Sequence, residues 1–177
     1  MMNLYLTTGT INYFLNAKKD DGNFLLSGNG ERGIAYYEAE ASQGLFNTGE
    51  EFEISHTHGD LSEENTMLVI HINTSAQKRA AARTKMNDLI DGLETTNGVQ
   101  AYRVGKMQDK YSFVIVVQFV NSDAYKAFSN SDLYESTVSN DALKSLRDEE
   151  SMFSNANSRS YYVPIKDLDE EDLEDSF

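Results

Sequence analysis

The sequence predicts an α+β fold, in which a ferredoxin-like half barrel follows a β-rich extension. The strongest observation is residues 111–120, where apolar side chains occupy both alternating faces, as in a central strand that is covered on both sides. The second is the order of elements over 66–165, which reads strand, helix, strand, strand, helices and strand. We therefore expect an N-terminal extension or subdomain at 1–65, a ferredoxin-like domain at 66–165 and an acidic tail at 166–177.

The N-terminal extension has short alternating segments separated by polar turns. A helix is expected from a cap at Thr8 or Thr10 through Lys18. The alternation predicts four short strands, of which the second and third are paired: 3–7, 24–27, 34–40 and 52–55.

From residue 66 the pattern becomes sharper. Alternation in the first strand places one set of side chains opposite another: Leu68, Ile70 and Ile72 against Met67, Val69, His71 and Asn73. Thr74 or Ser75 is expected to cap a helix with apolar residues three and four apart, which ends at Asn97 and Gly98. Strands at 99–104 and 111–120, a polar turn at 121–123, two short helices and a strand at 160–165 complete the domain.

Composition excludes several classes of protein. The 177 residues are long enough for one domain with a decorated end, and the absence of cysteine excludes disulfides and thiolate chemistry. The net charge of −14 argues against binding nucleic acid, whose phosphates are neutralised by Lys and Arg. Half of that charge lies in 167–177, which holds seven carboxylates and no base. No apolar run is long enough to span a bilayer, so we expect a cytoplasmic protein with no membrane partner.

Two short motifs have ordinary structural interpretations. The letters of Gly28–Gly33 match G-x-G-x-x-G, but a dinucleotide site needs a helix next, whereas strand-like alternation follows; we expect a hairpin turn. His56-Thr57-His58-Gly59-Asp60 resembles the start of a binuclear metal box. Because Leu61 stands where a further histidine is required, we interpret this segment as a loop leaving a strand.

Polar residues on the first strand of the domain are the remaining candidates. His71 and Asn73 share a face, and they are either half-buried structural groups or the lining of a pocket at the barrel mouth. The following helix carries four positive charges, which we interpret as a solvated face: Lys78, Arg79, Arg83 and Lys85.

The passage from the long strand into the helices resembles that of the antibiotic-biosynthesis-monooxygenase superfamily. The segments that carry this resemblance are Ala124-Tyr125-Lys126-Ala127-Phe128 and Ser131-Asp132-Leu133-Tyr134. Matches spread over most of the chain, from Leu4-Tyr5 to Tyr162-Val163-Pro164-Ile165-Lys166, resemble the target of RNAIII-activating protein and the two-part haem-degrading monooxygenases. The resemblance implies a dimeric α/β barrel in which two half barrels close on each other, and therefore a homodimer.

The resemblance also implies where haem chemistry would occur. Haem-degrading members use an asparagine on the first barrel strand, a tryptophan at the end of the long strand and a histidine that ligates iron. By spacing these positions fall near Val69, on Phe119 and on Val138, so all three groups are lost. Valine has no donor atom for iron. A rewired site would need His71, Asn73 or Tyr134 instead.

Two functions follow from these observations. The first is a non-catalytic homodimer that binds a small hydrophobic ligand or a partner and has lost the haem residues, so that no cofactor is firmly implied. The alternative is a haem-binding or haem-degrading monooxygenase with a rewired site. The candidates for the ligand pocket are Val69, His71, Asn73, Phe119, Tyr134 and Val138.

Overall fold

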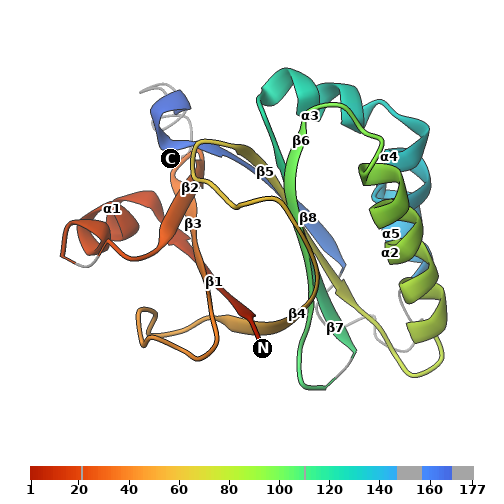
Figure 1. Ribbon diagram of the computed structural model, residues 1–177, viewed down its shortest axis with the longest axis horizontal. Coiled ribbons are helices and arrows are strands. Elements are labelled where there is room, and N and C mark those ends of the chain that lie inside the picture. Colours follow the sequence, from red (N-terminus) through yellow and green to blue (C-terminus); the bar gives the residue numbers. More distant parts are fainter. Residues whose placement is uncertain (21, 110, 147–156, 169–177) are drawn as a thin grey trace.

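The computed structural model describes all residues except 21, 110, 147–156 and 169–177. In the described residues, eight antiparallel strands form one closed barrel in the order β1-β3-β2-β8-β5-β7-β6-β4 (Figure 1). The strands are β1 (Asn3–Thr10), β2 (Leu25–Asn29), β3 (Arg32–Ala39), β4 (Glu50–His58), β5 (Thr66–Asn73), β6 (Val99–Lys106), β7 (Ser112–Phe119) and β8 (Ser158–Pro164). The helices are α1 (Ile11–Asp20), α2 (Arg79–Leu93), α3 (Ser122–Ser129), α4 (Asp132–Thr137), α5 (Asn140–Ser145) and the 3₁₀ turn η2 (Ile165–Asp167).

The barrel consists of two half barrels with the same topology. In the N-terminal half the strands lie in the order β4-β1-β3-β2, and in the C-terminal half in the order β8-β5-β7-β6. Each half therefore runs strand, helix, strand, strand, connection, strand. The halves join where β2 pairs with β8 and where β4 pairs with β6. The predicted β-rich extension thus forms the N-terminal half of the barrel.

The inner face of the barrel explains how the long strand is covered on both sides. Side chains from both halves form one buried cluster there: Leu4, Leu6, Ile34, Tyr36, Phe52, Met67, Val69, Val114, Val116 and Tyr162. In the homodimer that the resemblance implies, a half barrel from a second molecule would cover this face of β7. The chain's own N-terminal half supplies that cover, so this face of β7 is buried within one molecule and does not require a second one.

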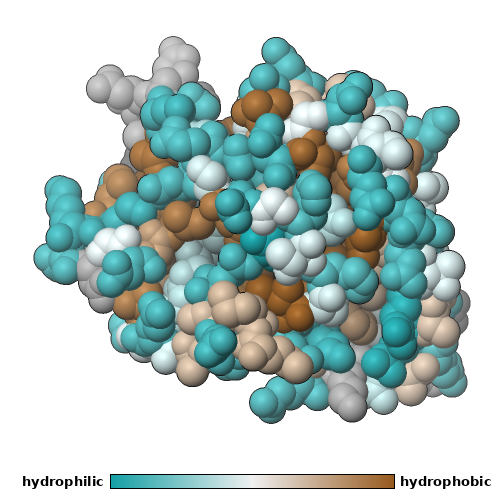
Figure 2. Space-filling view, viewed as in Figure 1, coloured by the Kyte–Doolittle hydropathy of each residue, from teal (hydrophilic) through white to brown (hydrophobic). Residues whose placement is uncertain are grey.

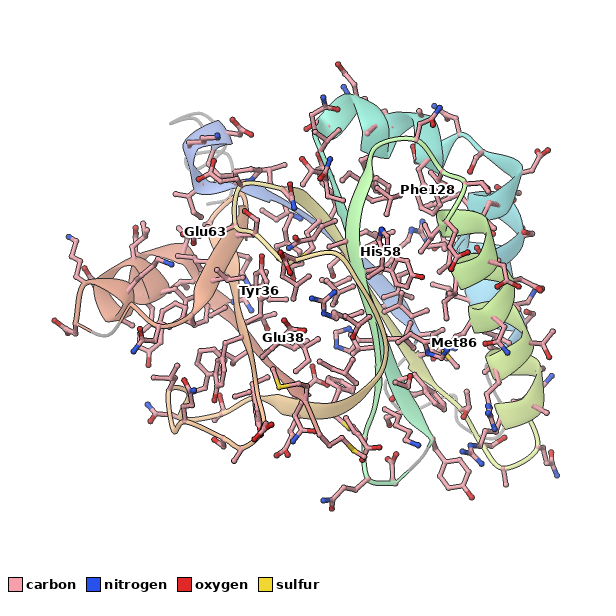
Figure 3. All side chains as sticks on the ribbon, viewed as in Figure 1. Tyr36, Glu38, His58, Glu63, Met86 and Phe128 are labelled. Atoms are coloured by element: carbon pink, nitrogen blue, oxygen red, sulfur yellow. The ribbon has the colours of Figure 1, made fainter. Side chains whose placement is uncertain are left out.

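Helices cover the two halves on the outside of the barrel. On the C-terminal half, α2, α3, α4 and α5 lie over the sheet and bury a large cluster that includes Met86, Leu89, Phe119 and Phe128 (Figures 1 and 3). On the N-terminal half, α1 buries Ile11 and Phe14 against the outer face of β1, β2 and β3. The faces predicted for β5 and β7 are confirmed, because Leu68, Ile70, Ile115 and Phe119 all point to the helices.

Local signals set most element boundaries. Asn29 pairs with Arg32 across a two-residue turn in which Gly30 adopts φ 62°, so the glycine-rich motif is the hairpin that was expected. The cap predicted for α2 was wrong: the helix begins at Arg79, and Ser75 instead accepts a bond from the Lys78 amide in the preceding turn. Among the described residues, three short helices follow β7, rather than two, because Ser139 caps a third.

The start of the acidic tail is structured. Lys166 pairs with Glu64, and Leu168 packs with Ile11 and Ile165 on the outer face of the N-terminal half. The rest of the predicted tail, 169–177, lies outside the described residues. Figure 2 shows a surface on which hydrophilic side chains predominate and hydrophobic atoms are scattered in small patches. Within the described part of the chain, no helix is long and apolar enough to cross a membrane.

Candidate functional site

The six candidate pocket residues lie in two separate places. Val69, His71 and Asn73 lie on the same face of β5 as Met67, which is the inner face of the barrel. Phe119, Tyr134 and Val138 lie between the sheet and the helices. The structure therefore does not bring the positions near Val69, at Phe119 and at Val138 into one pocket. The sheet separates Val69 from the other two.

The space between sheet and helices is a packed core, which we call the helix layer. Phe119 and Val138 are both 0 % exposed. The Phe119 ring lies 5.3 Å from that of Phe128 and 5.6 Å from that of Tyr125. Tyr134 meets Phe128 edge to face at 5.5 Å, and the guanidinium of Arg159 lies over its other side, 5.6 Å from the ring centre. Aromatic and aliphatic side chains thus fill the volume next to Val138.

The iron ligand expected by spacing is missing from this layer. Val138 offers no donor atom, and the three histidines of the chain lie elsewhere. His56 contacts Ser55 on β4, and His58 stacks on Tyr102 with ring centres 5.2 Å apart. Both belong to strand β4 rather than to the loop that was expected. The described residues contain no group of three or more His, Cys, Asp or Glu that could hold a metal ion.

His71 and Asn73 line a cleft of about 360 Å³ where β5 ends and β7 and β8 begin, which we call the barrel-end cleft. The Nε2 atom of His71 lies 2.9 Å from Oε1 of Glu50, and the ring of Phe52 lies 6.1 Å from the imidazole. The His71 side chain is 25 % exposed. Asn73 is held in place because its backbone N–H donates to Oδ1 of Asn157 at 2.6 Å. The cleft combines apolar walls with a histidine and a carboxylate.

The outer rim of this cleft is acidic. Glu50 and Met107 also line a larger groove of about 1150 Å³ beside β1 and β4. Its carboxylates are Glu40, Glu50, Glu51, Glu53 and Asp109, and Lys106 is the base among its lining residues. The cleft therefore adjoins a negatively charged rim at Glu50 and Met107, and this charge favours a neutral or cationic ligand over an anion.

Buried polar side chains secure the loop 59–65 against the barrel. Gln118 accepts bonds from the Ser62 amide at 2.8 Å and from Asn65 Nδ2 at 3.0 Å. Its own Nε2 donates to the Tyr36 hydroxyl at 2.8 Å. Burial raises the pKa of Tyr36 to about 12, because the phenolate would be desolvated among apolar side chains. This network holds the loop in place and is structural.

Arg103 is the most buried charge described inside the barrel. Its guanidinium pairs with Glu38 on β3, and it also donates to the carbonyls of His58 and Gly59, each at 2.8 Å. Figure 3 shows Tyr36 and Glu38 pointing into the barrel from β3. The sequence reasoning did not single out Arg103 or Gln118. The available signal was a polar side chain in each apolar strand, at 99–104 and 111–120.

The family comparison agrees with the fold. Residues 66–140 match the antibiotic biosynthesis monooxygenase family model. The C-terminal half belongs to the antibiotic biosynthesis monooxygenase superfamily. The match begins at the first residue of β5 and ends at the first residue of α5, so it covers most of one half barrel. The superfamily predicted from the sequence is therefore confirmed. No curated protein matches the chain.

Solved structures extend the similarity to both halves. A major regulator of staphylococcal pathogenesis has a TM-score of 0.75 and 19 % identity, covering 92 % of this chain and 99 % of that one. A monooxygenase-like protein from Listeria innocua has a TM-score of 0.72 and 17 % identity, covering 93 % and 94 %. A haem-degrading enzyme from Listeria monocytogenes has a TM-score of 0.67 and 16 % identity, covering 91 % and 98 %. At these identities the similarity establishes a shared fold.

Proposed function

We propose that this chain is a non-catalytic, regulatory member of the superfamily that binds a small ligand and has lost haem degradation. Its fold is shared by a regulator of staphylococcal pathogenesis and by a haem-degrading enzyme, so both activities are compatible with the scaffold. The observation that supports the regulatory alternative is the fully buried Val138, at the position that spacing predicts for the iron ligand of haem-degrading members.

The packing of the helix layer supports this proposal independently of the missing ligand. A haem in that layer would have to displace the rings of Phe119 and Phe128, and the side chains around them leave little exposed surface. Opening such a core costs several kcal/mol, about 3–5 for each large aromatic side chain that is lost from its site. Haem binding would have to offset this cost without an axial bond from Val138.

The barrel-end cleft is the ligand site in this proposal. Phe52, Met107 and Phe113 supply apolar walls, while His71 and Glu50 supply a hydrogen-bonded polar pair. Because carboxylates line the adjoining rim, the ligand we expect is hydrophobic and carries a neutral or positively charged polar group. The same rim disfavours haem, whose two propionates are negative.

A haem-binding protein with a rewired site is the second candidate. Its donors would be His71, in the barrel-end cleft, or the Tyr134 hydroxyl, at the edge of the helix layer. These two residues lie on opposite faces of the sheet, so a single haem cannot use both.

Titration with ferric haem distinguishes the two candidates. We expect the native protein to give only the broad spectrum of loosely held porphyrin, unchanged in His71→Ala and Tyr134→Phe. A sharp, stoichiometric Soret band that one of these substitutions abolishes would overturn the proposal and identify the axial ligand. Far-UV circular dichroism of each variant controls for folding.

The homodimer and the cytoplasmic location remain predictions. The closed barrel removes the uncovered face on which the dimer prediction was based, so a dimer needs another surface. Light scattering at micromolar concentration distinguishes a monomer of the chain mass, 19.9 kDa, from a species of twice that mass. A monomer would contradict the homodimer and leave the proposed ligand site unaffected.

A further inference from the structure

A second concave site lies on the outer face of the N-terminal half, between α1 and residues 45–48. We call it the α1 groove, and its volume is about 280 Å³. It lies against the end of β1, on the opposite side of the barrel wall from the inner cluster. The α1 groove shares no lining residue with the barrel-end cleft.

The groove exists because the two halves are covered unequally. On the C-terminal half, α2 has 15 residues and buries five of them, and α3, α4 and α5 complete the layer. In the topologically equivalent place on the N-terminal half, α1 has 10 residues and buries only Ile11 and Phe14. The connection from β3 to β4 contains no helix in the described residues and contributes Leu45 and Phe46 to the cluster. The volume that α2 and its neighbours fill on one half therefore stays open on the other.

Four aromatic rings line the groove. Tyr13 meets Phe14 edge to face at 5.4 Å, and Phe24 meets Phe46 in the same way at 5.7 Å. Phe14 and Phe24 are buried, whereas Tyr13 is 56 % exposed and stands at the opening. An aromatic ligand placed between these rings could therefore stack on their faces or pack against their edges.

The polar groups of the groove are uncharged. Thr7, Thr8, Asn47 and Thr48 contribute to its lining, and none of the described lining residues carries a charge, although a quarter of the chain is Asp, Glu, Lys or Arg. The cation of Lys18 lies 5.4 Å from the Phe24 ring centre and is already paired with Glu63 at 2.8 Å. An ionised ligand would lose its hydration here without gaining a partner of opposite charge.

We propose that the α1 groove binds a small, uncharged aromatic molecule with one hydrogen-bonding group. The four rings select an aromatic body, and the threonines with Asn47 select a single neutral polar group. The volume lies near the lower limit of small-molecule sites, about 300 Å³, so one or two fused or linked rings fill it. This site is independent of the function proposed for the barrel-end cleft.

The uncharged dye N-phenyl-1-naphthylamine, which fluoresces strongly in apolar surroundings, tests the proposal. We expect saturable binding to the native chain, and amide chemical-shift changes confined to the lining residues and their neighbours, at 7–9, 13–17, 24 and 45–48. Ala17→Phe places a ring in the groove from α1 and should weaken binding by about tenfold or more. Asn16→Phe adds the same ring on the exposed side of α1 and should bind the dye like the native chain.

Two further measurements complete the test. Phe46→Ala removes one wall and should also weaken binding, which covers the possibility that Ala17→Phe fails to fold. The sulfonated dye 8-anilinonaphthalene-1-sulfonate, which has similar rings and one negative charge, should bind about tenfold less tightly. Removing 169–177 should leave affinity unchanged. The proposal is overturned if the native chain binds no dye or if the shifts lie elsewhere. It is also overturned if Ala17→Phe folds and binds normally, or if the sulfonated dye binds equally well. A rise in affinity on removing 169–177 would overturn it too, since the chain's own C-terminal segment would then be the occupant.

Discussion

Replacing Arg103 by Met should destabilise the barrel more than any other change of a single charged side chain described above. The Arg103 side chain is 4 % exposed, and its partner Glu38 is 23 % exposed. The guanidinium also satisfies the carbonyls of His58 and Gly59, at the point where β4 ends and the loop to β5 begins. The substitution retains an apolar stem of similar length, so it removes mainly the charge and its hydrogen bonds.

The expected loss follows from the groups left unpaired. Breaking a buried ion pair by removing one partner costs about 3–5 kcal/mol, and the partial exposure of Glu38 lets water recover some of this, so we expect ~3 kcal/mol. That is a large fraction of the ~5–15 kcal/mol stability of a typical domain. The additional substitution Glu38→Gln should recover part of the loss, because it removes the unpaired charge.

Urea unfolding followed by circular dichroism measures this prediction. Arg159→Met is the matched control, because Arg159 is only partly buried and also donates to a backbone carbonyl, that of Val138, at 3.3 Å. We expect the control to lose about 1 kcal/mol or less. If Arg103→Met loses no more than Arg159→Met, Arg103 does not stabilise the barrel in the way argued above.

Two other predictions concern the inner network and the C-terminal segment. Because burial raises the pKa of Tyr36 from 10.0 to about 12, its proton stabilises the folded chain below pH 10 and that stabilisation is lost as the pH rises toward 12. Between pH 9 and pH 11 the native chain should therefore lose roughly 1.4 kcal/mol more stability than Tyr36→Phe in urea unfolding; equal losses would contradict this. Deleting 169–177 should leave the unfolding temperature unchanged, whereas deleting 168–177 removes Leu168 from the outer cluster and should cost about 1 kcal/mol. A large effect of the shorter deletion would show that residues 169–177 pack on the barrel.

Local patterns allowed nearly all the strands and the faces of β5 and β7 to be predicted. Alternation is a property of neighbouring residues, so the sequence displays it directly. Closure of the barrel was not predictable in the same way, since it depends on two pairings between distant segments, β2 with β8 and β4 with β6. The two halves also do not appear as an internal sequence repeat, because their connections differ. Helix α1 is shorter than α2, and residues 40–49 take the place that α3, α4 and α5 have in the other half.

The candidate residues divide between the two faces of the sheet, for a reason of register. A shift of one residue along a strand moves a side chain to the opposite face of the sheet. The asparagine position was placed near Val69, which faces the barrel interior, whereas Leu68 and Ile70 face the helix layer that contains Phe119 and Val138. Phe119, Tyr134 and Val138 lie in or beside one cluster on the helix side of the sheet. The pairing of His71 with Glu50 joins residues 21 apart in the sequence, and no local pattern predicts it.

Turnover of haem tests the central claim most directly. The purified chain is mixed with ferric haem, a reductant and oxygen, and the products are separated and identified by mass spectrometry. The account predicts no ring-opened product above the level produced by haem and reductant alone, because Val138 provides no iron ligand and the helix layer is packed. Formation of one defined ring-opened product in amounts exceeding the protein concentration would contradict the account and show that the chain is a haem-degrading monooxygenase.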